Sequence, residues 1–165
     1  MKLQSLIFLE NGKITDTTRI DKIIPTLKFL IKQNSKIIIL SHVGRPKGKF
    51  VNELTLNPIC KDLSKKLDQN IKLITNNINE INNKDLFKNK YEKIIMLENI
   101  RFYPEEENND PKFAKHLASL ADIYVNDAFS CSHRAHASIH QISKFLPSYS
   151  GLQLDLEVSA LKKIT

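Results

Sequence analysis

The sequence predicts an α/β fold, a three-layer Rossmann-like parallel sheet with helices on both faces. Short runs rich in β-branched residues, typical of strands buried on both sides, occur at 36–41, 93–97 and 122–125. Segments with helical spacing of apolar residues alternate with these runs. Because strands alternate with helices, a parallel sheet with right-handed crossovers is favoured. The 165 residues suffice for one domain with a hydrophobic core.

Each helix is expected from its apolar face and its end signals. Apolar residues recur on one face over 17–33 and again over 56–67. A third helix is expected over 111–120, with Asp110 as its N-cap and Pro111 at its first position. Between these segments we expect weaker strands at 3–8 and 71–74, and a polar, Asn-rich helix near 78–88.

The chain is expected to hold one α/β domain over 1–150, followed over 151–165 by the start of a further helix that the end of the chain interrupts. Hydrophobic residues make up 41% and charged residues 26%, as in a globular protein. No apolar run approaches the ~18 residues that span a bilayer, so no membrane contact and a cytoplasmic location are expected. Cys60 and Cys131 are far apart and are expected to be reduced thiols.

The basic residues argue against nucleic-acid binding. The net charge is +7, but 21 Lys and 4 Arg are scattered, and no aromatic RNA-binding motif or finger spacing accompanies them. A net positive charge suits the binding of a small anionic substrate if the cationic side chains converge on one site. Where Lys is the ordinary cation, each Arg is notable.

The four arginines follow the predicted strands. Arg45 follows the strand at 36–41, Arg101 follows the strand at 93–97, and Arg134 comes shortly after the strand at 122–125, while Arg19 lies early in the first helix. Ligands of open parallel sheets bind outside the carboxyl ends of the strands. Guanidinium groups bind carboxylate and phosphate oxygens bidentately. The residues alone therefore predict a site for a small ligand with more than one anionic group.

Other kinds of site have weaker support. His42, His133, His136 and Cys131 lack the spacing of a metal site, and we expect none. Asp127 could serve as a general base, although a role in bracing backbone amides is the commoner one. The segment from Gly44 to Phe50 differs from a nucleotide-binding P-loop, because it is one residue short and Phe50 replaces the Ser or Thr.

Four stretches resemble the phosphoglycerate kinase family in order and spacing. They are GKITDTTRI at 12–20, SHVGRPKG at 41–48, the stretch from LENIRFYPEEE to YVNDAF at 97–129, and HRAHAS at 133–138. The resemblance covers nearly the whole chain from Gly12 onward, and its motifs are specific. It implies the fold of that family's amino-terminal domain.

The resemblance also implies a reaction, in which ATP and 3-phosphoglycerate give ADP and 1,3-bisphosphoglycerate in glycolysis. In the family, the amino-terminal domain binds 3-phosphoglycerate, a carboxy-terminal domain binds Mg-ATP or Mg-ADP, and hinge closure joins them. The segment 151–165 would then start the helix that leads to the hinge, and the nucleotide-binding domain would be absent from this chain. No nucleotide site is expected here.

The residue roles implied by the resemblance are carried over by position. Substrate binding falls to Arg19, Arg45, Arg101 and Arg134, together with His42, Val43 and Gly44, while His133 has a supporting role. Arg19 also matches the arginine that steadies the transferring phosphoryl group, which makes it the catalytic candidate.

Two departures from the family affect the expected activity. The family's first strand normally ends in V-D-F-N-V-P, whose Asp and Asn hold the substrate, whereas this chain has LQSLIF at 3–8. The chain also ends at Thr165. We therefore expect an incomplete enzyme, inactive alone. The alternatives are a non-catalytic module that binds a phosphorylated acid, and a partner domain for a separately encoded nucleotide-binding half.

Overall fold

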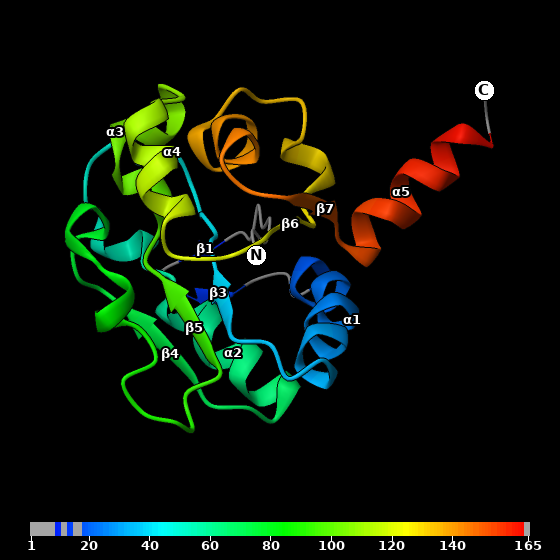
Figure 1. Cartoon of the computed structure of the whole chain (residues 1–165), viewed down its shortest axis with the longest axis horizontal. Coiled ribbons are helices and arrows are strands. Elements are labelled where there is room, and N and C mark those ends of the chain that lie inside the picture. Colours follow the sequence, from blue (N-terminus) through cyan, green and yellow to red (C-terminus); the bar gives the residue numbers. More distant parts are fainter. Residues whose placement is uncertain (1–8, 11–12, 15–17, 164–165) are drawn as a thin grey trace.

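The structure, a computed structural model, describes residues 9–10, 13–14 and 18–163, and the side chains of residues 9, 10, 13, 14 and 19 lie outside the described set. Its helices and strands alternate along most of the chain, as the sequence predicts (Figure 1). The strands are β1 (Leu9–Glu10), β2 (Lys13–Ile14), β3 (Ile37–Ile39), β4 (Ile71–Ile74), β5 (Ile94–Leu97), β6 (Tyr124–Asn126) and β7 (Ser148–Ser150). The α-helices are α1 (Thr18–Lys32), α2 (Asn57–Leu67), α3 (Pro104–Glu107), α4 (Pro111–Ala118) and α5 (Leu152–Lys162).

Short helical turns fill the connections between these elements. Six are 3-10 turns and η6 is a single π-helical turn: η1 (Asn52–Leu54), η2 (Ile78–Glu80), η3 (Asn83–Asp85), η4 (Ile100–Phe102), η5 (Phe129–Cys131), η6 (Ala137–Gln141) and η7 (Ile142–Lys144).

The main sheet is parallel and has the order β3-β5-β4. A second parallel pair, β6-β7, lies beside it, and β1 and β2 form a small antiparallel pair. The strands expected at 36–41, 71–74, 93–97 and 122–125 are therefore present, with small shifts of their ends. The strand expected at 3–8 lies outside the described residues.

Helices cover both faces of the sheet, which confirms the predicted three-layer α/β class. Alternate residues of β3 enter different cores, with Ile37 and Ile39 in one and Ile38 and Leu40 in the other. This alternation follows from the two-residue period of a strand. The first core is closed by α1 and α2, and the second by α4. Both faces are thus withdrawn from water, and the polar ends of the strands are left for binding.

The predicted end signals of α4 are confirmed. The Asp110 side chain accepts a hydrogen bond from the Phe113 backbone N–H at 2.8 Å, and Pro111 occupies the first turn. Because Pro lacks an N–H, it costs no hydrogen bond at this position. The helix expected over 151–165 is present as α5, which extends away from the body of the molecule (Figure 1).

The expectation of one Asn-rich helix near 78–88 is wrong. The segment forms the separate turns η2 and η3. Ile78 uses its backbone elsewhere, since its N–H donates to the Tyr103 hydroxyl at 2.9 Å and its carbonyl bonds His116 Nε2 at 2.7 Å. Asn77 and Asn82 each begin a new turn by capping it. Asn side chains compete with the helical backbone in this way.

Candidate anion-binding site at the strand ends

The loops that follow β3 and β5 are joined by their backbones. The Ile100 N–H donates to the Ser41 carbonyl at 3.2 Å, and the Gly48 N–H donates to the Arg101 carbonyl at 3.2 Å. Gly44 and Gly48 both have positive φ, of 66° and 71°. Such angles suit glycine and let the first loop turn back toward the second. Two of the predicted arginine loops are therefore one unit.

Arg101 lies inside this unit and is 1% exposed. Its Nη1 donates to the Gly44 carbonyl at 3.0 Å, and its Nε lies 3.6 Å from the Glu107 carboxylate. Burial lowers the pKa of Arg101; the negative charge of Glu107 opposes this shift, and the nearby cation of Arg134 adds to it. Nε of Arg101 is buried and makes no hydrogen bond to the described part of the chain.

Arg134 and His133 come from the segment after β6. The turn η5 positions them, and the Arg134 N–H donates to the Cys131 carbonyl at 2.8 Å. Arg134 is half-buried and His133 is exposed. The positive charge of Arg134 adds to the lowering of the Arg101 pKa, so these two predicted cations lie within electrostatic range of each other.

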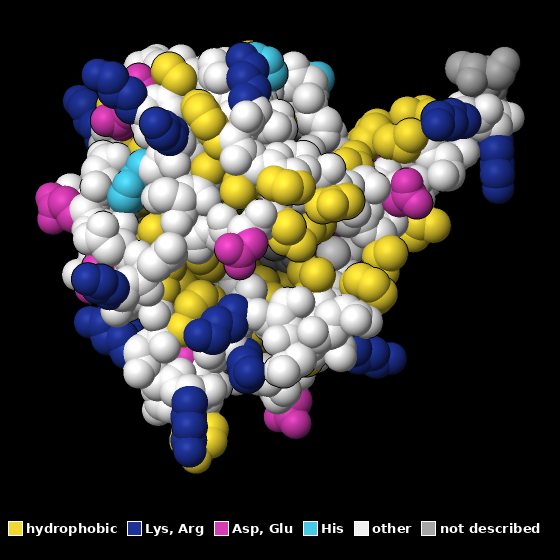
Figure 2. All heavy atoms as spheres, viewed as in Figure 1, with side chains coloured by type: hydrophobic (Ala, Val, Ile, Leu, Met, Phe, Trp, Pro, Cys, Tyr) yellow, Lys and Arg dark blue, Asp and Glu magenta, His cyan; other side chains and the backbone are white. Residues whose placement is uncertain are grey.

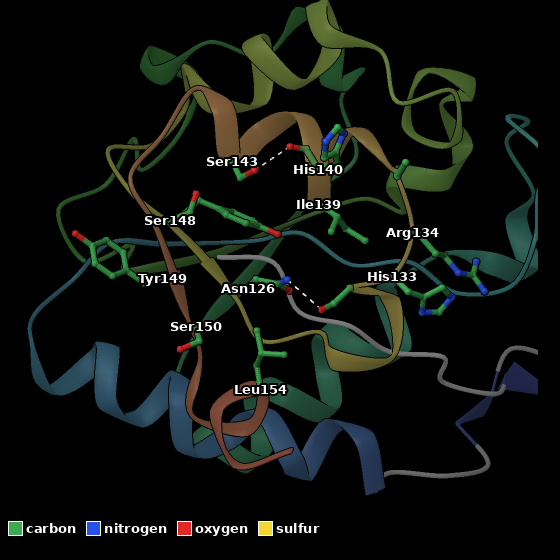
Figure 3. Close-up of a pocket in the computed structure, with 13 residues that line it drawn as sticks. Asn126, His133, Arg134, Ile139, His140, Ser143, Ser148, Tyr149, Ser150 and Leu154 are labelled. Carbon is green, nitrogen blue, oxygen red and sulfur yellow. Dashed lines mark hydrogen bonds between the residues drawn. The ribbon is translucent and has the colours of Figure 1, made fainter. Parts of the chain in front are cut away.

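A cavity of about 470 Å³ opens beside Arg134. Figure 3 shows the side chains of His133 and Arg134 next to each other at one end of the drawn residues, with Tyr149 at the other. Three serine hydroxyl groups also line the cavity, from Ser143 of η7 and from Ser148 and Ser150 of β7. None of the described residues that line the cavity is acidic. The surroundings of Arg134 therefore favour a negatively charged or neutral polar occupant over a cation.

The remaining predicted residues lie at varied depths. His42 and Val43 are buried at 1% exposure each, whereas Arg45 is exposed on the same loop. The Val43 carbonyl accepts a hydrogen bond from the Asn99 side chain at 2.9 Å. Arg19 belongs to α1, but its side chain is outside the described set, so its predicted role stays a prediction.

The glycine loop after β3 does not fit a nucleotide phosphate. The Gly48 N–H already bonds the Arg101 carbonyl, and a Cβ on Gly48 would lie 2.8 Å from Pro104. In addition, α2 begins only at Asn57, whereas a P-loop opens directly into a helix. Among the residues that the structure describes, no group of three or more possible metal ligands occurs. The backbone of this loop therefore does not provide a site for a nucleotide phosphate.

Asp127 has the bracing role that sequence considerations favoured over a general base. It is 3% exposed, and its Oδ1 accepts a hydrogen bond from the Leu154 N–H at 2.9 Å, in the first turn of α5. A Cβ on Gly151 would collide with the Asp127 carboxyl carbon. This close approach explains a glycine at the start of α5.

Asn99 and Glu107 are the contacts that sequence reasoning missed. Both residues lie in the stretch at 97–129 that resembles the family, and the sequence alone assigns neither of them a role. A polar residue next to a strand end, two positions before an arginine, is a weak signal that could have found Asn99. The Val43 carbonyl that Asn99 binds is 56 residues away in sequence. The approach of Glu107 to Arg101 becomes clear only from the fold.

Comparisons with known proteins agree with these features. A family model for phosphoglycerate kinase matches residues 7–165. Phosphoglycerate kinases from Wolbachia sp. subsp. Brugia malayi and Moorella thermoacetica are 49% and 43% identical to the chain over 155 residues, 94% of its length. The chain spans 39% of the length of each of these relatives.

Solved structures of the same kind share the fold. Phosphoglycerate kinase from Coxiella burnetii superposes with a TM-score of 0.87 at 36% identity, over 98% of this chain and 40% of that one. The enzyme from Pyrococcus horikoshii gives a TM-score of 0.86 at 26% identity, over 98% and 41%.

Proposed function

The chain belongs to the phosphoglycerate kinase family, and from that premise we propose that it is the part of such an enzyme that binds 3-phosphoglycerate. One observation carries the proposal. Arg101 is buried with an Nε that makes no hydrogen bond to the described residues, although Glu107 lies 3.6 Å from it, and Arg134, half-buried on a separate loop, adds a second positive charge that acts on it. Buried like charges are costly unless an anion lies between them. A ligand with phosphate and carboxylate groups would supply that anion.

The residues would divide the work by their positions. Arg101, from its buried position, and Arg134, from the edge of the cavity of about 470 Å³, would hold one anionic group, and Arg45 would approach from the exposed loop. His42, Val43 and Gly44 would line the same loop, His133 would support Arg134, and Arg19 would act on the transferring phosphoryl group. Family enzymes work chiefly by positioning and by neutralising charge.

The phosphotransferase reaction also needs Mg-ATP or Mg-ADP. We propose that the nucleotide is bound by the part of the relatives that this chain does not span, and that the chain alone does not catalyse transfer in glycolysis. The helices of the described residues include none long and apolar enough to cross a bilayer. A cytoplasmic site of action is part of the same proposal.

Calorimetry with 3-phosphoglycerate tests the binding claim. We expect the chain to bind it, and Arg101→Ala or Arg45→Ala to weaken binding at least about tenfold, since a charge-assisted hydrogen bond contributes ~1.5–3 kcal/mol. Lys112→Ala, an exposed lysine of α4, matches the change in charge and should leave affinity unchanged. Absent binding, or affinity untouched by both arginine variants, contradicts the proposal. Arg45→Ala keeps the test valid if the buried variant misfolds.

A second candidate is a partner domain for a separately supplied nucleotide-binding half. The observation that favours it is α5, whose Leu152, Leu156 and Leu161 are 44%, 65% and 52% exposed. In Figure 2 apolar side chains follow this projecting helix. The chain spans 39% of the length of the relative from Wolbachia sp. subsp. Brugia malayi, and we propose that a half supplying the remainder covers these leucines.

A further inference from the structure

Asn99 is fully buried and has no solvent to bind its amide. A side-chain amide carries two N–H donors and one carbonyl acceptor, and each of these is expensive to leave unpaired inside a protein. The contacts that satisfy Asn99 therefore show what its position requires.

Both donated hydrogen bonds of Asn99 go to the chain that follows β3. Nδ2 donates to the Val43 carbonyl at 2.9 Å and to the Leu54 carbonyl at 3.0 Å. One amide group thus holds the start and the end of the segment that carries Arg45. Arg45 is exposed, so its loop depends on such backbone contacts for its place.

The acceptor of Asn99 serves the second arginine loop. Oδ1 accepts a hydrogen bond from the Arg101 N–H at 3.1 Å, which caps the turn η4. Arg101 in turn donates from Nη1 to the Gly44 carbonyl at 3.0 Å. The amide of Asn99 and the guanidinium of Arg101 thereby bond successive carbonyls, those of Val43 and Gly44.

Resting on the proposed function, we propose that Asn99 is a positioning residue, which sets the distance between the Arg45 loop and Arg101 for a ligand with phosphate and carboxylate groups. No other side chain type supplies two donors and one acceptor at this reach. Aspartate lacks both donors, and alanine lacks all three groups. An error of about 1 Å in such a geometry can cost ~100-fold in function.

Two substitutions separate the parts of this contact. Asn99→Asp keeps the oxygen that caps Arg101 and loses the bonds to Val43 and Leu54, whereas Asn99→Ala loses everything. We expect both to weaken 3-phosphoglycerate binding at least about tenfold in calorimetry. Asn52→Ala removes an exposed amide from the same segment and should leave affinity unchanged.

A variant could bind the ligand more weakly only because it is less stable, and not because the Arg45 loop and Arg101 are displaced. Leu63→Ala opens a cavity in the core beneath α2 without removing any hydrogen bond of Asn99, and serves as a destabilised control. At a temperature where all variants are folded, it should bind like the parent chain. If folded Asn99 variants bind as tightly as the parent, or no more weakly than Leu63→Ala, the proposal is overturned.

The hydrogen-exchange rate of the Asn99 side-chain amide in the parent chain is a second test, and it needs neither a ligand nor a folded variant. The Asn99 side-chain amide should exchange much more slowly than that of exposed Asn52. Equal exchange rates overturn the positioning role. If the parent chain fails to bind 3-phosphoglycerate while its Asn99 amide is protected, the proposed substrate is wrong and the contact between the loops stands.

Discussion

Buried carboxylates brace the backbone of this protein at several points. Glu98 accepts hydrogen bonds from the Thr55 hydroxyl at 2.6 Å and from the backbone N–H groups of Leu56 and Asn99, each at 2.8 Å. Glu106, at 1% exposure, bonds both the amide and the hydroxyl of Ser138. Because an unpaired buried carboxylate is costly, these contacts fix their loops firmly. The candidate site is held in part by acids that do not face its ligand.

One such acid affects a thiol, which gives a pH prediction. Burial first, and the negative charge of Glu98 second, raise the pKa of Cys60 from 9.0 to about 11. Between these values the unfolded thiol has lost its proton and the folded one keeps it, so stability falls as pH rises. We expect the parent chain's advantage over Cys60→Ala to shrink by about 1 kcal/mol between pH 8 and pH 10.

Urea unfolding of both proteins at the two pH values measures this. The difference between the proteins matters, because lysines and tyrosines titrate in both and largely cancel. A gap that stays constant, or widens with pH, would show that the thiol is not held neutral by its surroundings.

At the site, sequence reasoning found the arginines but not their depth. Arg45, Arg101 and Arg134 follow strands, so their common edge could be predicted. That Arg101 is buried, whereas Arg45 is exposed, depends on two loops more than 50 residues apart in sequence. Periodicity reports the environment along one element and carries no information on such pairing.

At the scale of elements, long amphipathic segments were predictable and short ones were not. The helices α1, α2 and α4 have apolar faces and end signals, and they match expectation within about two residues. The strand β7 consists of exposed Ser148, Tyr149 and Ser150, without any apolar pattern. It is a strand because β6 pairs with it, as the bond from the Tyr124 N–H to the Pro147 carbonyl shows.

The N-cap of α4 predicts how much this helix end contributes to stability. Asp110→Ala removes the acceptor of the Phe113 N–H and should lower the free energy of unfolding by about 1 kcal/mol. Asp110→Asn should retain most of the stability, since asparagine caps as well as aspartate. Chemical denaturation measures both, with Asp122→Ala as an exposed control expected within ~0.5 kcal/mol of the parent. Equal stability of the alanine variants at 110 and 122 would contradict the capping role.

The whole molecule joins two cores through one layer of strands. Val125 of β6 packs with the core under α1 and α2, and Tyr124 packs with the core under α4. The β6-β7 pair is therefore part of the same middle layer as β3, β5 and β4. Alternation of strands and helices predicted this layering, whereas the break between the two sets of strands has no signal in the sequence.

Reconstitution tests the molecule as a unit. Alone, the chain should not make ATP from 1,3-bisphosphoglycerate and Mg-ADP in a coupled assay. Together with the separately produced nucleotide-binding half of a relative, it should form a complex on size-exclusion chromatography. Leu156→Asp on exposed α5 should weaken that complex, whereas Ser159→Asp adds the same charge to this helix without loss of apolar area and should leave the complex intact. Turnover by the chain alone would refute the first claim, and separate elution of the halves the second.

The helix α5 is held firmly at its first turn, while the rest of it projects from the molecule. Its Leu152 N–H donates to the Thr26 hydroxyl at 3.0 Å, its Leu154 N–H donates to Asp127, and Gly151 leaves no space at the joint. At ~1.5 Å per residue the helix is roughly 16 Å long. A rotation of about 10° at Gly151 would therefore move its far end by about 3 Å. Asp127 directly follows β6, so a small shift at the end of this strand would become a larger displacement at the far end of α5. A fluorescent dye attached near Lys162 would detect that displacement.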